Sequence, residues 1–200
     1  EIQTFDGADN LERELNRLET GAIDGDNPLH VFIEFGALYN SNITLTPISR
    51  ELTGTGPASF QGFLSPDLQW TLLESERWRA GPLSRGYFTL NEDNYRSLNL
   101  ASFQPGLFFE RDLPVCFGCE LVGRVEYVYS YDQLNGARFG DRHAVTTSLT
   151  SINPQANVTY AYFTAGLSDF AQDGADPTVD SLDGLALTTG VSHFFTTNNS

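Results

Sequence analysis

An aspartate and a histidine two residues apart form the first group of side chains that could do chemistry. Asp141 and His143 lie in a segment with β-strand character, so both side chains point to the same face. With Ser148 they would supply the acid, base and nucleophile of a hydrolase. Ser148 has the opposite parity to His143 and lies too far along the strand for a nucleophile–base contact. We therefore expect a histidine at the rim of the fold, bonded to an aspartate or to water, and a chain that is not an enzyme.

The two cysteines form a second group. Cys116 and Cys119 occur in the sequence Val-Cys-Phe-Gly-Cys, and such a pair can be a redox motif, half of a zinc site or a local disulfide. The three histidines are scattered along the chain, and Gly118 followed by a β-rich run favours a turn between strands over the start of a helix. We expect a disulfide across this turn, with a reduced and inert pair as the alternative.

Aspartates gather in a third group, between residues 169 and 183. Carboxylates at this density could bind calcium, but their spacing does not match the loop of an EF-hand. We therefore expect a solvated acidic loop, with no metal site and no cofactor. The aspartates are Asp169, Asp173, Asp176, Asp180 and Asp183.

The composition limits the class of protein. The 200 residues carry a formal net charge of −15, with no lysine among the eleven basic residues. A nucleic-acid-binding protein would need a basic stripe, so we expect no nucleic-acid partner. No run of about 18 apolar residues is present, which excludes a transmembrane helix. The absence of methionine indicates a mature or trimmed form whose export signal, if it had one, was removed.

Eight alternating segments are the elements that must position these groups. In most of them apolar residues recur at every second position, which is the period of a half-buried strand. Pro82 and Pro105 break the alternation in the third and fourth segments, where we expect β-bulges. The segments are Leu29–Thr44, Ala58–Leu72, Arg77–Leu90, Tyr95–Glu110, Glu120–Asp132, Arg142–Ile152, Asn157–Ser168 and Gly184–Phe195.

The gaps between the segments tend to alternate between long and short. Residues 45–57, 133–141 and 169–183 form long gaps, 73–76 and 153–156 form short ones, and 91–94 and 111–118 are intermediate. Long strands joined by short turns on one side and longer loops on the other are typical of outer-membrane barrels. The pattern predicts an all-β, antiparallel, up-and-down transmembrane β-barrel of about eight strands over residues 29–195.

The two ends of the chain differ from this pattern. Leu11, Leu15 and Leu18 have helical spacing, and Gly21, Gly25 and Pro28 follow them. We expect residues 1–28 to be a periplasmic segment with one short amphipathic helix. Residues 196–200 form a polar C-terminal tail.

The polar positions of the strands are candidates for the inside of the barrel. In an eight-stranded barrel side chains just fill the interior, and charges there would pair with one another. In a larger barrel they would line a channel and set its selectivity. The lumen-facing candidates are Glu34, Asp67, Gln69, Arg124 and Glu126.

Two stretches resemble a known family. Phe35 to Ile43 (FGALYNSNI) resembles the opening strand of bacterial outer-membrane β-barrels that follow a periplasmic helical-repeat domain, such as the surface lipoprotein assembly modifier type. The stretch TTGVSHFF, which ends at Phe195, resembles the closing strand that the barrel assembly machinery reads. The resemblance implies a location in the cell outer membrane, contact with its lipid, and the assembly machinery as a partner during biogenesis.

The expected function is that of an integral outer-membrane β-barrel, either a structural or anchoring barrel or a pore for small solutes. Three alternatives stay open. A soluble lipocalin-like barrel would bind an apolar ligand, with Tyr127, Tyr129 and Tyr131 pointing inward. A hydrolase at the rim would depend on His143. A barrel subunit of a larger cell-surface assembly would bind a protein partner through the N-terminal segment or the loops.

Overall fold

One antiparallel β-sheet makes up nearly all of the described structure. The computed structural model describes residues 27–40, 59–155, 157–170 and 183–195. The expected N-terminal helix, the first long gap, most of the aspartate-rich loop and the C-terminal tail lie outside these residues. The strands are β1 (Leu29–Asn40), β2 (Ser59–Trp70), β3 (Leu73–Ser75), β4 (Trp78–Asn91), β5 (Leu100–Cys116), β6 (Cys119–Leu134), β7 (Ala137–Ile152), β8 (Val158–Phe170) and β9 (Gly184–Phe194).

The strands follow one another in the sheet in the order of the sequence. Eight of them form the path β1-β2-β4-β5-β6-β7-β8-β9, and the short β3 pairs only with β4. Every pairing is antiparallel. The expected up-and-down arrangement of eight long strands is therefore confirmed.

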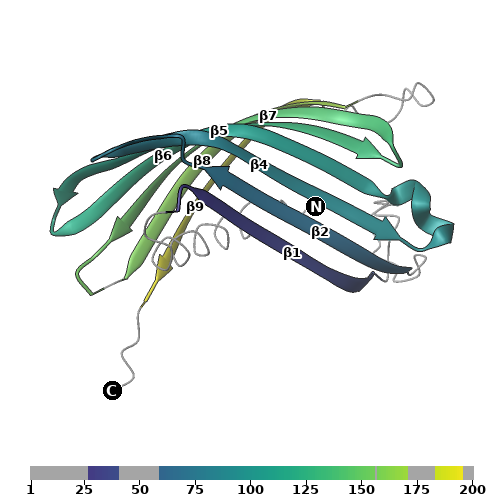
Figure 1. Cartoon of the computed structure of the whole chain (residues 1–200), viewed down its shortest axis with the longest axis horizontal. Coiled ribbons are helices and arrows are strands. Elements are labelled where there is room, and N and C mark those ends of the chain that lie inside the picture. The colour runs from purple at the N-terminus through teal and green to yellow at the C-terminus, as the bar shows by residue number, and fades with distance from the viewer. Residues whose placement is uncertain (1–26, 41–58, 156, 171–182, 196–200) are drawn as a thin grey trace, which may run out of the picture.

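The expected closure into a barrel is not present. The path begins at β1 and ends at β9, and these two strands are the edges of an open sheet. The sheet is bent into an arch, with β1 and β9 along its two lower edges (Figure 1). A bent, twisted sheet is the starting geometry of a barrel, but only pairing between the edges would close it.

Several expected loops are turns or parts of strands. The gap expected at 133–141 is a two-residue turn at Asn135 and Gly136, and the gap at 111–118 is a two-residue turn at Phe117 and Gly118. Positive φ at all four residues permits the tight primed turns that join antiparallel strands. The gap at 91–94 leads into a 3-10 helix, η1 (Asp93–Leu98). The alternation of long and short gaps is therefore much weaker than the sequence indicated.

Neither proline makes a bulge in the β4–β5 ladder, whose register runs through both without a shift. Register shifts fall between Leu113 and Cys116, between Asp132 and Gln133, and on the other side of Pro82, where three residues separate the β2 and β3 pairings against two residues of β4. Each proline instead lies at a break in a ladder. Pro82 faces the space between the ends of β2 and β3, and Pro105 lies in an interruption of the β5–β6 pairing. A residue without an N–H fits where no ladder bond is made.

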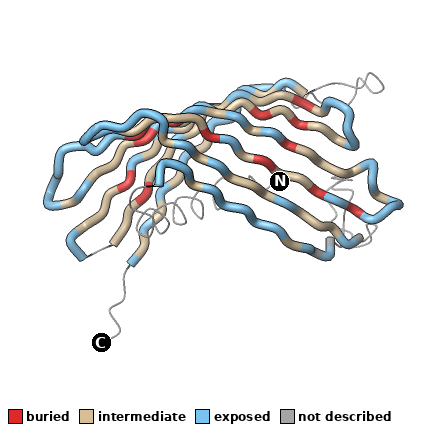
Figure 2. Tube along the Cα trace, in the orientation of Figure 1, coloured by how far each residue is buried: buried red, intermediate tan, exposed pale blue. Residues whose placement is uncertain are grey.

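The two faces of the sheet differ sharply. We call the face that carries Arg124 and its same-side neighbours the polar face, and the opposite one the apolar face. Buried residues are spread along the strands from β4 to β8 (Figure 2), and they include Glu110, Arg124, Asp132 and Thr150 of the polar face. The hydrophobic side chains of the apolar face are exposed instead. Among them are Ile33, Phe35, Leu64, Leu68, Leu107, Val125, Val145, Leu149, Phe163, Leu167, Leu187 and Val191.

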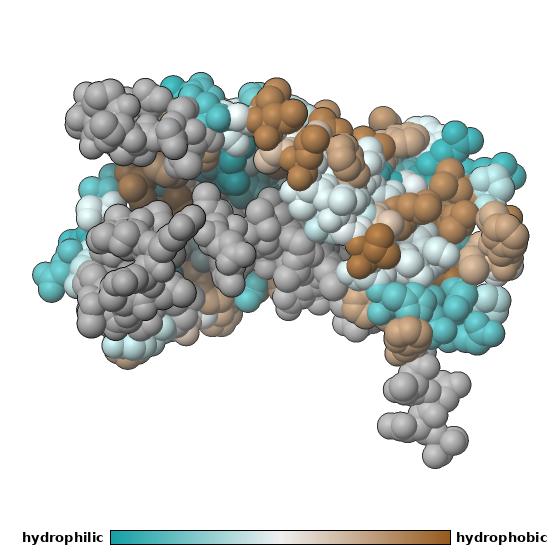
Figure 3. Space-filling view, turned by 180° about the vertical axis from the view of Figure 1, so that it is seen from behind, coloured by the Kyte–Doolittle hydropathy of each residue, from teal (hydrophilic) through white to brown (hydrophobic). Residues whose placement is uncertain are grey.

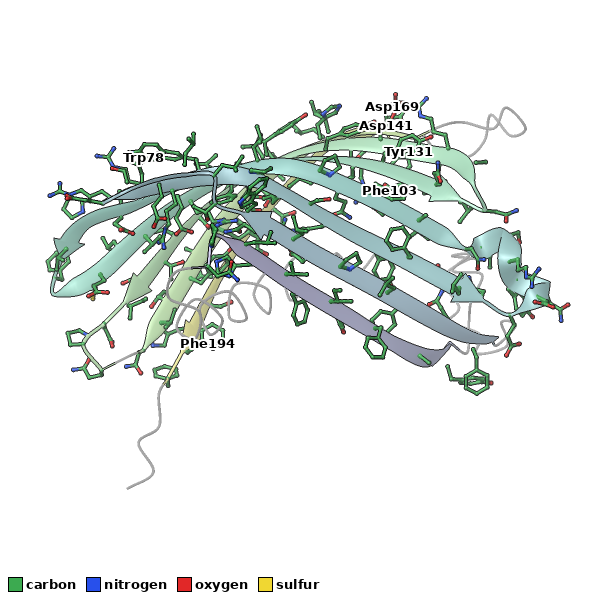
Figure 4. The ribbon with its side chains drawn as sticks, viewed as in Figure 1. Trp78, Phe103, Tyr131, Asp141, Asp169 and Phe194 are labelled. Carbon is green, nitrogen blue, oxygen red and sulfur yellow. The ribbon has the colours of Figure 1, made fainter. Side chains whose placement is uncertain are left out.

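Aromatic residues border the exposed apolar side chains at both ends of the strands. Tyr39, Phe60 and Phe103 lie toward the end that includes η1, and Trp70 and Trp78 lie toward the other end. Figure 4 shows Trp78 near one end of the arch and Asp141, Asp169 and Tyr131 near the other. Hydrophobic side chains also reach the surface in clusters in the space-filling view from behind (Figure 3).

Candidate functional site

A network of alternating charges crosses the polar face from β2 to β6. Its six main members are three arginines and three carboxylates, whose formal charges cancel, and the exposed Asp112 adds a longer contact to Arg79 at 3.8 Å. Each link joins an arginine to a carboxylate on a neighbouring strand, on the same strand or two strands away. In order along the chain of contacts the members are Asp67, Arg85, Glu126, Arg124, Glu110 and Arg79.

Arg124 is the centre of this charge network. Its Nε donates to Glu126 Oε1 at 2.7 Å, and its Nη1 lies 3.1 Å from Glu110 Oε2. Its Nη2 donates to Gln69 Oε1 at 2.7 Å. The guanidinium also lies over the ring of Phe108, with Cζ 4.5 Å from the ring centroid, which is a cation–π contact. Four neighbours on three strands therefore fix one planar cation.

The other two arginines extend the network to its ends. Arg85 donates from Nε to Asp67 Oδ2 at 3.2 Å and from Nη2 to Glu126 Oε2 at 3.0 Å. Arg79 Nη2 lies 2.6 Å from Glu110 Oε1. Glu110 thus receives Arg79 on one oxygen and Arg124 on the other, which compensates a carboxylate whose residue is only 1% exposed.

The register of the sheet explains why these residues meet. Arg124 is the ladder partner of Glu110, Glu110 is the partner of Arg79, and Arg85 is the partner of Asp67. Directly opposed residues of antiparallel strands have Cβ atoms about 5 Å apart, so opposite charges there interact. Two contacts reach farther: Arg85 to Glu126 spans two strand spacings, across β5, and Arg124 to Gln69 spans three, across β5 and β4.

The sequence identified part of this network. Asp67, Gln69, Arg124 and Glu126 come together as members or neighbours of it. Glu34 shares their face by register but is exposed on the edge strand β1, opposite Ser65. Arg79, Arg85 and Glu110 were missed. The proline in the third segment hid the alternation of Arg79 and Arg85, and Glu110 was taken for the end of a strand that continues to Cys116.

A second polar cluster lies on the same face toward the η1 end. Ser102 donates to Asp132 Oδ1 at 2.6 Å, and Gln104 donates to the Ser102 hydroxyl at 3.0 Å. Arg142 Nε donates to Asp132 Oδ2 at 2.9 Å. The buried Asp132 carboxylate is therefore held from both sides, as a buried charge requires.

Polar side chains on the apolar face are bonded within the sheet. The Tyr127 hydroxyl and His143 Nδ1 are 2.8 Å apart, as are the Thr159 hydroxyl and His193 Nδ1. The Thr189 hydroxyl donates to the backbone carbonyl of Tyr162 at 3.0 Å.

The hydrolase group is not assembled. Asp141 accepts from the Tyr129 hydroxyl at 2.9 Å and pairs with Arg138, while His143 is bonded to Tyr127. Ser148 lies on the polar face as the ladder partner of Arg124. His143 and Ser148 therefore belong to opposite faces of β7, as their parity indicated.

The two cysteines lie where the sequence placed them, on either side of a turn. Cys116 and Cys119 are ladder partners at the ends of β5 and β6, and both are free thiols. The disulfide between them stays a prediction.

No group of three or more His, Cys, Asp or Glu side chains in the described part of the chain is arranged to hold a metal ion. The helical residues in that part do not form a helix long and apolar enough to cross a membrane.

Known proteins give no relative for this arrangement. Comparison with models of protein families, with curated proteins and with solved structures found no match to the chain.

Proposed function

We propose that this chain is an integral β-barrel of a bacterial outer membrane, with the apolar face against lipid and the polar face toward the lumen. The observation that carries the proposal is the exposed apolar face itself, which extends over all eight long strands and has aromatic residues toward both ends. Exposed patches of this extent mark contact surfaces. Alternation of lipid-facing and lumen-facing residues, with aromatic girdles at both interfaces, is the pattern of transmembrane barrels.

The bonding of polar groups on the apolar face supports the same conclusion. In hydrocarbon no water is present to satisfy a hydroxyl or an imidazole, so each must find a partner in the protein. The Tyr127 hydroxyl bonds to His143 Nδ1, the Thr159 hydroxyl bonds to His193 Nδ1, and the Thr189 hydroxyl bonds to a backbone carbonyl. A water-facing surface would not need these internal partners.

The charge network favours a structural or anchoring barrel over an open pore. The three arginines and the three carboxylates of the main network neutralise one another along the polar face, and Glu110 and Arg124 are almost fully buried. Charges that are paired in this way fill and stiffen the interior of a narrow barrel. They would not present the free charged ring that gives a channel its ion selectivity.

The lipocalin-like alternative fits these observations less well. It requires an apolar interior, with Tyr127, Tyr129 and Tyr131 directed toward it. Tyr127 is instead exposed on the apolar face, and the opposite face carries the buried ion pairs. Outer-membrane lipid and the barrel assembly machinery are the partners that the proposal implies.

Expression of the full chain behind an export signal tests the proposal. We expect the protein to fractionate with the outer membrane, to require detergent for extraction, and to migrate differently on a gel before and after boiling. A known soluble periplasmic protein is the fractionation control. Recovery in the soluble fraction without detergent, and a single gel band at both temperatures, would contradict the proposal.

A further inference from the structure

One row of ladder partners crosses the whole sheet. Each residue of the row is paired with the next, from the second residue of β1 to the third residue of β9. The row is His30, Gln69, Leu83, Gly106, Val128, Ala144, Gly166 and Ala186. The row meets both edge strands near their starts, at His30 of β1 and Ala186 of β9. Because β1 and β9 run in opposite directions, β1 extends from the row toward one end of the sheet and β9 extends toward the other end.

The strands are therefore strongly staggered across the sheet. If the edges met along this row, only residues 184–187 of β9 would face residues 29–32 of β1, and most of both strands would have no partner. If the strands met end to end, with Gly184 opposite Asn40 and Phe194 opposite His30, all eleven residues of β9 would be paired. The second arrangement moves the partner of Ala186 from His30 to Leu38, which is eight residues farther along β1.

An offset of this size is what a barrel needs. Eight residues at about 3.3 Å each, set against eight strand spacings of about 4.8 Å, give a strand tilt of about 35°. Closed barrels have tilts of roughly 35–45°. The stagger of the open sheet thus already matches closure by its own eight long strands.

The two edges carry few of the features that protect an edge strand. β9 contains no Asp, Glu, Lys, Arg or Pro, and the charged residue Glu34 is the only one of these in β1. Long, uncharged edges are ready to pair with another strand. In a membrane their backbone groups must be bonded, because an open edge in hydrocarbon is very costly.

From the stagger and the edges we infer that β9 pairs with β1 of the same chain, antiparallel and end to end, and closes an eight-stranded barrel. In this register Ile33 meets Val191 and Ala37 meets Leu187, so apolar-face residues face one another along the seam. Polar-face positions also meet, with Glu34 opposite Gly190. The inference rests on the proposed membrane function and names the strand that covers each edge.

Paired cysteines test the seam. In a chain carrying Cys116→Ser and Cys119→Ser, Ala37→Cys and Leu187→Cys are introduced together, and the membrane-inserted protein is treated with a short bifunctional thiosulfonate. We expect an intramolecular cross-link, so that the boiled protein migrates as a looped chain, apart from the linear chain, until the link is reduced. The register control replaces Ala37→Cys with Tyr39→Cys, which places the two thiols two residues out of alignment, and we expect a much lower yield.

Three results would overturn the inference. The first is a cross-linked dimer, which would place a second copy at the edge. The second is a higher yield from the Tyr39→Cys pair than from the Ala37→Cys pair. The third is a folded membrane protein that gives no cross-link. Fractionation separates the two proposals. Inserted protein without the cross-link contradicts only the seam, whereas an intramolecular cross-link in soluble protein contradicts only the membrane function.

Discussion

At the scale of single residues, the polar face depends on the mutual compensation of buried charges. Glu110 and Arg124 are 1% and 5% exposed, so neither charge is solvated to any useful extent by water. Their pairing does not by itself make the fold more stable than an apolar core would, because desolvation offsets most of the attraction. Removing one partner is different, because it leaves the other charge buried and uncompensated.

Arg124→Ala should therefore destabilise the protein strongly. The substitution leaves Glu110 and Glu126 with one cation fewer, and the loss of a partner in a buried pair costs about 3–5 kcal/mol. Urea unfolding in detergent micelles, followed by the fluorescence of Trp70 and Trp78, measures the change.

Arg96→Ala is the matched control for this prediction. Arg96 also pairs with a carboxylate, that of Asp93, but both side chains are largely exposed in η1. Exposed pairs contribute little to stability, so we expect an unfolding curve close to that of the parent. If both substitutions lowered the free energy of unfolding by the same amount, the burial of the charge network would not explain the loss in Arg124→Ala.

At the scale of the elements, two tight turns together with the one-residue register shift beside each of them fix the registers of the central strands. The β6–β7 turn uses Asn135 and Gly136 with φ of 50° and 78°, and the β5–β6 turn uses Phe117 and Gly118 with φ of 51° and 76°. The register they set aligns Glu110 with Arg124 across one hairpin and Arg124 with Ser148 across the next. A slip by one residue would move every one of these side chains to the other face.

Gly136→Ala should weaken the second of these hairpins. Left-handed backbone costs a residue with a Cβ atom about 1–2 kcal/mol relative to glycine, so the free energy of unfolding should fall by about that amount. Gly166→Ala is the control, since Gly166 lies in β8 without positive φ and an added Cβ would make only an ordinary contact at 3.6 Å. Thermal unfolding of both variants in the same detergent provides the comparison. A Gly166→Ala loss as large as that of Gly136→Ala would contradict this account of the turn.

At the scale of the whole molecule, the question is whether water or lipid contacts the apolar face. Eight strands expose hydrophobic side chains on one side and hold ion pairs on the other. In water the buried polar face and exposed apolar face would be an inverted arrangement. In lipid they are the expected one, since the lumen is the polar side of a transmembrane barrel.

Val145→Arg separates these two environments. Val145 lies near the middle of β7 on the apolar face and is 44% exposed. An arginine there should cost about 2–4 kcal/mol if the position is near the midplane of a bilayer, but a surface substitution in water usually changes stability by less than about 0.5 kcal/mol. Unfolding of the protein inserted in lipid vesicles measures the difference.

Thr146→Arg is the control on the opposite face of the same strand. Its ladder partner is Glu126, which Arg85 and Arg124 already contact. Its hydroxyl lies 2.8 Å from that of Thr164, so an arginine at this position meets a polar surface rather than hydrocarbon. We expect a clearly smaller loss than for Val145→Arg. Two small and similar losses in vesicles would place the apolar face in water and argue against the membrane proposal.

The sequence alone determined the strands and the polarity of their faces. The period of two is a local property, so strands such as β6 and β8 could be located from Leu121 to Tyr131 and from Tyr160 to Phe163 without any knowledge of their neighbours. All five lumen-facing candidates share the polar face by register, and four of them belong to the charge network or contact it. The turn at Asn135 and Gly136 also had a local signal, the Asn-Gly dipeptide, and it was missed because the alternation of gaps predicted a loop there.

Only the tertiary structure decided which residues meet. The contacts of Arg124 with Gln69, Glu110 and Glu126 join three strands, and the partners of a strand depend on register across intervening turns rather than on its own pattern. The same holds for the edges. Alternation shows that β1 and β9 are strands, but the stagger that accumulates over seven pairings decides where one could meet the other.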